Sequence, residues 1–198
     1  MQPQRNKLMI KFKPSIILTI VGLITVLISS QVHSDTVPQD SIYQLDSTWV
    51  DQDGNKRLLK SFSGKKQLIS LIYTHCLHTC PTIVSTMQAI ESKLSKQDAK
   101  NTSFILVSLT PDTDTPEVLK EFAQSRKLSS NNWSLLTGTP EDVRSLAMVL
   151  NVKFQSVDDN EVNHSNLITA LDQQGRIKFQ ELGVLYNANK AVEKLSEF

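Results

Sequence analysis

Residues 68–81 read LISLIYTHCLHTCP, and this short run joins a hydrophobic segment to a pair of cysteines. The six residues from Leu68 to Tyr73 are mostly apolar, which is typical of a buried β-strand. Pro81 follows the second cysteine, and proline is favoured in the first turn of a helix because its missing N–H is not needed there. The run therefore predicts a buried strand that leads through a cysteine-containing loop into a helix.

Strand and helix patterns alternate through the centre of the chain. Apolar runs predict two further buried strands, at residues 104–109 and 133–136. Threonine-proline pairs that begin at Thr115 and Thr139 predict that a helix follows each strand. Strands that are connected through helices pair in parallel, so the centre of the sheet should be largely parallel.

Hairpin patterns lie on either side of this central part. One hairpin is predicted to join residues 48–50 to 56–59, and the other to join residues 167–171 to 176–182. A last helix should begin near Ala188. This order predicts an α/β protein with the thioredoxin-like fold, in which helices flank a mixed central sheet that carries an N-terminal β-hairpin extension.

The N-terminal segment differs in composition from the rest of the chain. Residues 1–34 contain four basic residues and no acidic one, and a mostly apolar run of 13 residues, Ile16 to Ile28, follows the basic stretch. A membrane-spanning helix needs about twenty apolar residues, so this run suits the core of an export signal. We expect residues 1–34 to be a signal peptide, or else an N-terminal anchor that tethers the protein to the inner membrane through residues 14–30. Either interpretation puts the domain at 35–198 in an extracytoplasmic space such as the periplasm.

The charge of the chain argues against nucleic acid as a partner. Without the four basic residues of the N-terminal segment, 17 basic residues remain against 20 acidic ones, a net charge of −3. Proteins that bind nucleic acid depend on clustered basic residues to neutralise phosphates.

Hydrophobic residues make up 39% of the chain, which is enough for an ordinary core.

The two cysteines, Cys76 and Cys80, are separated by only three residues. A disulfide across so short a loop contributes little stability, so the spacing favours chemistry over a structural cross-link. The N–H groups and the dipole at the start of a helix favour the thiolate form of both side chains. Two neighbouring thiolates are suitable ligands for a soft cation such as Cu(I).

A third ligand would come from one of four histidines. His33 lies in the N-terminal segment, whereas His75 and His78 flank the cysteines. His164 precedes the strand predicted at 167–171, which in a thioredoxin-like fold neighbours the strand that carries the cysteine loop. Judged from the residues alone, a metal ligand and an ordinary turn histidine are equally good interpretations of His164.

Four ordered motifs resemble those of the Sco/SenC family. They are YTHCLHTCPT at 73–82, SLTPDTDTPEVL at 108–119, LLTGTPE at 135–141 and VNHS at 162–165. The similarity extends from about Ile42 to the end of the chain. It implies a copper metallochaperone that assists assembly of the copper centre of cytochrome c oxidase. It further implies that Cys76, Cys80 and His164 bind the copper ion, as Cu(I) or Cu(II).

The resemblance also implies partners and marks two departures from the family pattern. The partners would be the copper-bearing subunit of cytochrome c oxidase, or a similar copper-site client, and a thiol reductant. The family loop commonly carries proline and aspartate between its cysteines, where this chain has Leu77, His78 and Thr79. Asn163 stands where aspartate commonly precedes the ligand histidine. Neither change removes a ligand, and the family role implies no catalytic turnover.

A thiol–disulfide reductase is the main alternative to a metallochaperone. Such a protein would keep the cysteines of a copper-site client reduced, with Cys76 and Cys80 as its redox-active pair. General oxidoreductases of the thioredoxin type use Cys-x-x-Cys and a cis-proline before the last hairpin. No proline follows Pro140 in this chain, which argues against that broader activity and leaves the narrower reductase open.

Two other functions have weaker support. A peroxiredoxin would carry proline and threonine where this chain has Ile69 and Tyr73. A structural zinc site would need four ligands, which the two cysteines, His164 and His78 could supply. A strand-to-helix loop is already ordered without a metal, so zinc is a minor alternative.

Overall fold

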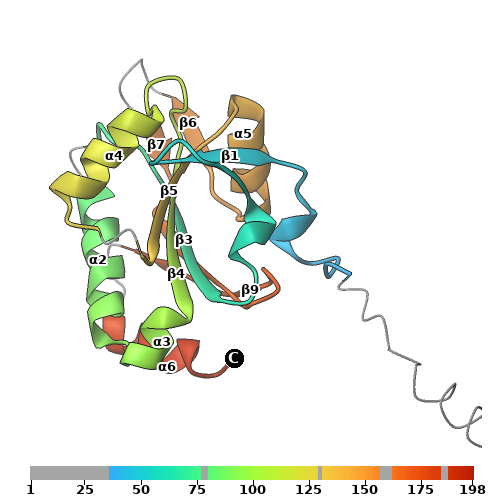
Figure 1. Ribbon diagram of the computed structural model, residues 1–198, viewed down its shortest axis with the longest axis vertical. Helices are drawn as coiled ribbons and strands as arrows, with labels where there is room; N and C mark the ends of the chain where they lie inside the picture. Colours follow the sequence, from blue (N-terminus) through green and yellow to red (C-terminus); the bar gives the residue numbers. More distant parts are fainter. Residues whose placement is uncertain (1–35, 77–79, 129–130, 157–161, 184–186) are drawn as a thin grey trace, which may run out of the picture. The chain divides into compact units, whose positions relative to one another are not determined.

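A mixed sheet of seven strands lies at the centre of the structure, with strand order β2-β1-β5-β4-β3-β8-β9 (Figure 1). The computed structural model describes residues 36–76, 80–128, 131–156, 162–183 and 187–198. The strands of this sheet are β1 (Thr48–Asp51), β2 (Lys56–Leu58), β3 (Lys66–Ile72), β4 (Thr102–Ser108), β5 (Trp133–Thr137), β8 (Leu167–Leu171) and β9 (Ile177–Leu182).

The pairing of the strands confirms the predicted sheet. β3 pairs in parallel with β4 along its whole length, from Lys66 opposite Thr102 to Ile72 opposite Ser108, and β4 pairs in parallel with β5. The other pairs are antiparallel, including the predicted hairpins β1–β2 and β8–β9. β8 also pairs with β3, so the last hairpin neighbours the strand that leads to the cysteines, as expected.

Helices cover both faces of the sheet, with α2 and α4 on one side and α5 on the other (Figure 1). The α-helices are α2 (Cys80–Lys93), α3 (Lys96–Lys100), α4 (Pro116–Ser125), α5 (Pro140–Val149) and α6 (Ala188–Leu195), and two 3₁₀-helices are η1 (Ile42–Gln44) and η2 (Leu59–Phe62). The side chains of Thr115 and Thr139 cap α4 and α5, each accepting a hydrogen bond from a backbone N–H in the first turn. Both helix starts predicted from the threonine-proline pairs are therefore confirmed.

Helix α2, which begins at Cys80, is held firmly against the sheet. Ile83, Met87 and Ile90 form its apolar face and are fully buried. Glu91 of the same helix accepts a hydrogen bond of 2.8 Å from the indole N–H of Trp133 in β5. These contacts fix the helix against the sheet.

Two small elements differ from the sequence-based prediction. Strands β6 (Phe154–Ser156) and β7 (Val162–His164) form a separate two-stranded antiparallel sheet, whereas His164 was expected in a loop. Each strand has three residues, which is too short to show an alternating pattern. Helix α3 was also unpredicted, since its five residues include no buried side chain and so show no apolar face; Ser95 caps its start.

Residues 37–198 form one compact unit. Within the part of the chain that the structure describes, no helix has the length and apolar character needed to cross a membrane. The signal peptide or anchor expected at residues 1–34 lies outside the described residues, as does His33.

The buried carboxylate of Asp51 closes the turn of the N-terminal hairpin. It accepts hydrogen bonds from the backbone N–H groups of Asp53 and Asn55, at 3.0 and 2.8 Å, and pairs with Nε of Arg57 at 2.8 Å. Burial acts to raise the pKa of Asp51, but these hydrogen bonds together outweigh burial and lower the pKa below its ordinary value of 3.8. The ionised form is therefore the one that the fold stabilises.

We expect Asp51→Asn to lower the free energy of unfolding at pH 7 by about 2 kcal/mol, because an amide cannot accept all of these hydrogen bonds. A carboxyl whose pKa is lowered by folding contributes stability above its unfolded pKa, and this contribution is lost as pH falls through the folded pKa. In urea denaturation, the difference in the free energy of unfolding between wild type and D51N should therefore become smaller as the pH falls below the ordinary pKa of 3.8. As a control, Asp53→Asn breaks only an exposed pair with Lys120 and should cost about 0.5 kcal/mol or less. Equal losses for the two variants at pH 7 would contradict this account.

Candidate metal centre

Cys76 lies at the edge of the sheet where β3 and β4 both end. Its backbone N–H donates to the carbonyl of Tyr73 at 3.3 Å, so the cysteine loop begins with a tight turn. The residue is only 5% exposed, which shields the sulfur from bulk solvent. The backbone of Cys80 opens α2, and the two cysteines therefore bracket the strand-to-helix junction as predicted. Residues 77–79 and the side chain of Cys80 lie outside what the structure describes.

His164 ends β7 and packs against the residue that follows β3. Its ring meets the ring of Tyr73 edge to face, with centroids 6.0 Å apart and an interplanar angle of 79°. Nδ1 of His164 lies 3.2 Å from the carbonyl oxygen of Ser165. In the tautomer that donates from Nδ1 to this carbonyl, Nε2 carries the lone pair that a metal ligand requires.

Burial lowers the pKa of His164 below its ordinary value of 6.5, while the hydrogen bond to Ser165 acts in the opposite direction. Desolvation is the larger effect because it penalises the charged imidazolium. The ring consequently stays neutral to a lower pH than an exposed histidine would. A neutral imidazole is the form that can donate a lone pair to a metal ion.

The predicted site residues are brought together only in part. His164 contacts Tyr73, which is three residues before Cys76, so the ring and the cysteine loop share one end of the sheet. Among the described residues, no three His, Cys, Asp or Glu side chains cluster closely enough to hold a metal ion. His75 is exposed, with Nδ1 at 3.3 Å from Oγ1 of Thr74, and His78 lies outside the described residues.

A buried carboxylate beside the cysteine loop was missed by the sequence analysis. Asp114 is 0% exposed and accepts four hydrogen bonds. Its Oδ2 accepts from Oγ of Ser108 at 2.6 Å, Oγ1 of Thr110 at 3.1 Å and the backbone N–H of Thr74 at 3.2 Å. Its Oδ1 accepts from Oγ1 of Thr74 at 2.5 Å. These four residues are termed the Asp114 knot below; the only hint in the sequence was the density of hydroxyl and carboxyl side chains in the motif at 108–119.

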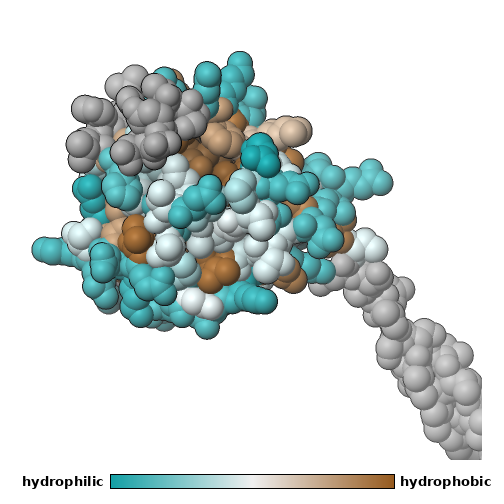
Figure 2. Space-filling model, turned by 90° about the horizontal axis from the view of Figure 1, so that it is seen from above, coloured by the Kyte–Doolittle hydropathy of each residue, from teal (hydrophilic) through white to brown (hydrophobic). Residues whose placement is uncertain are grey.

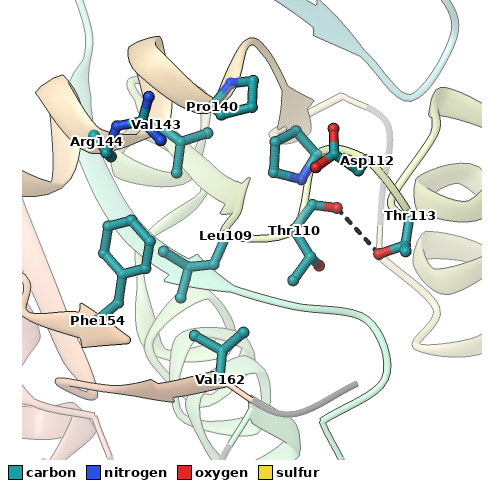
Figure 3. Close-up of a pocket in the computed structure, with 10 residues that line it drawn as sticks. Leu109, Thr110, Asp112, Thr113, Pro140, Val143, Arg144, Phe154 and Val162 are labelled. Atoms are coloured by element: carbon teal, nitrogen blue, oxygen red, sulfur yellow. Dashed lines mark hydrogen bonds between the residues drawn. The ribbon is translucent and has the colours of Figure 1, made fainter. Parts of the chain in front are cut away.

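A pocket of about 460 Å³ lies next to this end of the sheet (Figure 3). Apolar side chains of Leu109, Val143, Phe154 and Val162 gather on one side of it in the close-up. Val162 belongs to β7, the strand that carries the candidate histidine, so the pocket and the candidate metal centre share an element. Seen from the end of the domain where β6 and β7 lie, the surface is mostly hydrophilic with apolar residues gathered in patches (Figure 2).

The strand order, and the cysteine pair at the junction of a central strand and a helix, define a protein of the thioredoxin-like class. Comparison with known families then identifies the group within this class. The sequence profile of the SCO1/SenC family matches residues 37–198, and the chain belongs to that family. The resemblance found in the four sequence motifs is thereby confirmed.

Individual relatives agree with this assignment. The chain is 35% identical over 91 residues to the SCO1 protein homolog of Bacillus subtilis (strain 168), a stretch that covers 46% of this chain and 47% of that protein. The structure is similar to that of Bradyrhizobium japonicum ScoI with copper bound, with a TM-score of 0.62 and 26% identity over 76% of this chain and 96% of that one. It is also similar to BsSco, described as a member of the Sco family of cytochrome c oxidase assembly proteins that has a disulfide switch, with a TM-score of 0.67 and 25% identity over 75% of this chain and 88% of that one. The matched part spans about half the length of the first curated relatives.

In an NMR titration of the reduced, metal-free protein, we expect the His164 ring to lose its proton at a pH below the ordinary value of 6.5, because the ring is partly buried. Tyr73→Ala removes the neighbouring ring and should move the midpoint back toward the ordinary value. Tyr43→Phe is the matched control, since Tyr43 is an aromatic residue that bonds Gln67 and has no part in the His164 contact. A wild-type midpoint at or above the ordinary value would show that the ring is solvated.

Proposed function

We propose that this protein binds a copper ion through Cys76, Cys80 and His164 and assists assembly of the copper centre of cytochrome c oxidase. The observation that carries the proposal is the contact of His164 with Tyr73, three residues from Cys76. Membership of the SCO1/SenC family supports it, as does the similarity to a copper-bound ScoI structure.

The proposed ligands are suited to both oxidation states of copper. Thiolates are soft ligands that favour Cu(I), whereas imidazole nitrogen also suits Cu(II). The helix start at Cys80 favours thiolate because backbone N–H groups and the helix dipole stabilise negative charge there. Burial keeps His164 neutral and able to donate its lone pair. Copper is then a cargo that the protein holds and passes on.

The proposed partners follow from this role. They are the copper-bearing subunit of cytochrome c oxidase, or a similar copper-site client, and a thiol reductant that keeps Cys76 and Cys80 in the dithiol state. Relatives in the family include a lipoprotein and mitochondrial proteins, which supports a location outside the cytoplasm. We extend this to an extracytoplasmic, periplasmic domain whose residues 1–34 serve as signal peptide or membrane anchor.

A second candidate function is reduction of a client disulfide, and the disulfide switch of BsSco favours it. In this reaction one cysteine thiolate would attack a client disulfide and form a mixed disulfide. The other cysteine would then displace the client thiol, so that Cys76 and Cys80 end as a disulfide while the client gains two electrons. The two functions use the same sulfurs and are separated by measuring what the client receives, copper or electrons.

Reduced protein should bind one Cu(I) per chain, and Cys76→Ser or Cys80→Ser should each weaken binding by at least about 100-fold, because one soft thiolate of two is lost. The measurement is competition with a chromogenic Cu(I) chelator under anaerobic conditions. His75→Ala is the matched control, since His75 is exposed beside the same loop. Full affinity in either serine variant would remove that cysteine from the ligand set.

His164→Ala should affect the two oxidation states differently. Cu(I) tolerates two sulfur ligands, so its binding should weaken mildly, whereas Cu(II) prefers nitrogen and should lose most of its affinity. Visible absorption and electron paramagnetic resonance of the Cu(II) form provide the readout. Equal losses for Cu(I) and Cu(II) would contradict this division of roles.

Copper binding and disulfide formation should compete for the same two sulfurs. An equilibrium titration in a glutathione buffer, with and without Cu(I), measures the competition. Copper should shift the equilibrium toward the dithiol by its binding free energy, and the oxidised protein should contain no copper. If copper leaves the apparent potential unchanged, the metal site and the cysteine pair are separate.

A further inference from the structure

Asp114 differs from the other deeply buried carboxylates of the domain. Asp51 pairs with Arg57 and Asp172 pairs with Arg176, and each closes a hairpin turn within its own short segment. Among the ion pairs of the described residues, none involves Asp114. Burying a carboxylate is costly unless hydrogen bonds compensate it, and here all of the compensation comes from the Asp114 knot.

The Asp114 knot joins two parts of the chain that are far apart in sequence. Ser108 ends β4 and Thr110 follows it, so these two residues anchor the carboxylate to the core of the sheet. Thr74 lies 40 residues earlier and contributes both its backbone N–H and its hydroxyl. Two hydrogen bonds to one residue restrain its backbone as well as its side chain. The carboxylate therefore ties the entrance of the cysteine loop to the end of β4.

Contacts on either side of Thr74 extend this restraint to the candidate metal centre. Tyr73, one residue earlier, meets the ring of His164 and accepts the backbone hydrogen bond of Cys76. We propose that Asp114 is a positioning residue, which holds Thr74 and with it the start of the cysteine loop at Cys76, at the end of the sheet where His164 lies. This inference rests on the proposed copper-binding function for its consequence, but the restraint itself can be tested without copper.

The expected loss of Cu(I) affinity can be estimated from the backbone order that the Asp114 knot imposes on Thr74. Fixing the backbone of one residue corresponds to about a 5- to 30-fold change in an equilibrium constant. In the wild type, the Asp114 knot orders Thr74 before copper binds. Without the knot, Thr74 would become ordered only on binding, and the cost of ordering it should weaken Cu(I) binding by about tenfold. Loss of these hydrogen bonds should also make Cys76, which is 5% exposed in the intact protein, more accessible.

The test compares Asp114→Ala and Asp114→Asn with Asp172→Ala in the full chain. Asp172 is a suitable control because it is 3% exposed and accepts comparable hydrogen bonds from Gln174 and Arg176. It follows Leu171, which pairs with Gln67 near the start of β3, at the opposite end of the sheet from the cysteine loop. Both alanine variants should lower the melting temperature, so this measurement alone cannot distinguish a positioning role from a structural one.

Two further readouts are taken at a temperature where circular dichroism shows every variant folded. One is the alkylation rate of Cys76 by iodoacetamide in the reduced, metal-free protein, followed by peptide mass spectrometry. The other is Cu(I) affinity by chelator competition. Asp114→Ala should raise the alkylation rate and weaken Cu(I) binding, each by about tenfold, and Asp114→Asn should have a smaller effect because its carbonyl oxygen still accepts. Asp172→Ala should change neither quantity.

The outcomes separate this inference from the proposed function. Unchanged alkylation and copper affinity in Asp114→Ala would overturn the positioning role, even if the wild type binds copper tightly. A wild type that binds no Cu(I) would overturn the proposed function, while faster alkylation of Asp114→Ala would still support the restraint on the loop. If Asp114→Ala does not fold, Thr74→Val is the variant to use, because it keeps the shape of the side chain and removes only its hydroxyl. That variant should raise alkylation about threefold, and a wild-type rate would overturn the inference.

Discussion

The parallel ladder between β3 and β4 is the constraint on which the rest of the structure depends. Parallel strands run in the same direction, so the segments that follow them emerge at the same edge of the sheet. The ladder continues past the strands, where the N–H of Leu109 donates to the carbonyl of Ile72 at 2.7 Å. A slip of one residue would turn Ser108 to the opposite face and take its hydroxyl away from Asp114. The register thus determines both the core and the surroundings of the cysteine loop.

Much of this arrangement could be predicted from the sequence because it depends on local patterns. Apolar runs predicted β3, β4 and β5. The threonine caps predicted where α4 and α5 start, to within a residue or two. The pairing of Phe154 with His164 could not be predicted, since strands of three residues have no pattern of their own and form only against a partner. The pairing of β6 with β7 therefore depends on tertiary structure and not on a local sequence pattern.

The candidate site shows the same division between local and tertiary information. The spacing of Cys76 and Cys80 before a proline predicted that they bracket a strand-to-helix junction, which is a local property. Asp112 and Asp114 are two residues apart in a stretch of similar composition, yet one is exposed and the other is 0% exposed. Asp114 is distinguished by the hydrogen bonds that it accepts, two of which come from the distant Thr74. The lowered pKa of His164 likewise depends on burial that the sequence does not reveal.

The small β6–β7 sheet has a consequence for how such a protein can diverge. It shares no ladder with the seven-stranded sheet, so changes in its length or sequence leave the register of the core intact. Val162 lines the neighbouring pocket and His164 ends the same strand, so one short hairpin carries a candidate ligand and part of the surrounding surface. A change in this hairpin would therefore alter a candidate ligand and the pocket lining together, while the pairing of β3 in the seven-stranded sheet stays as it is.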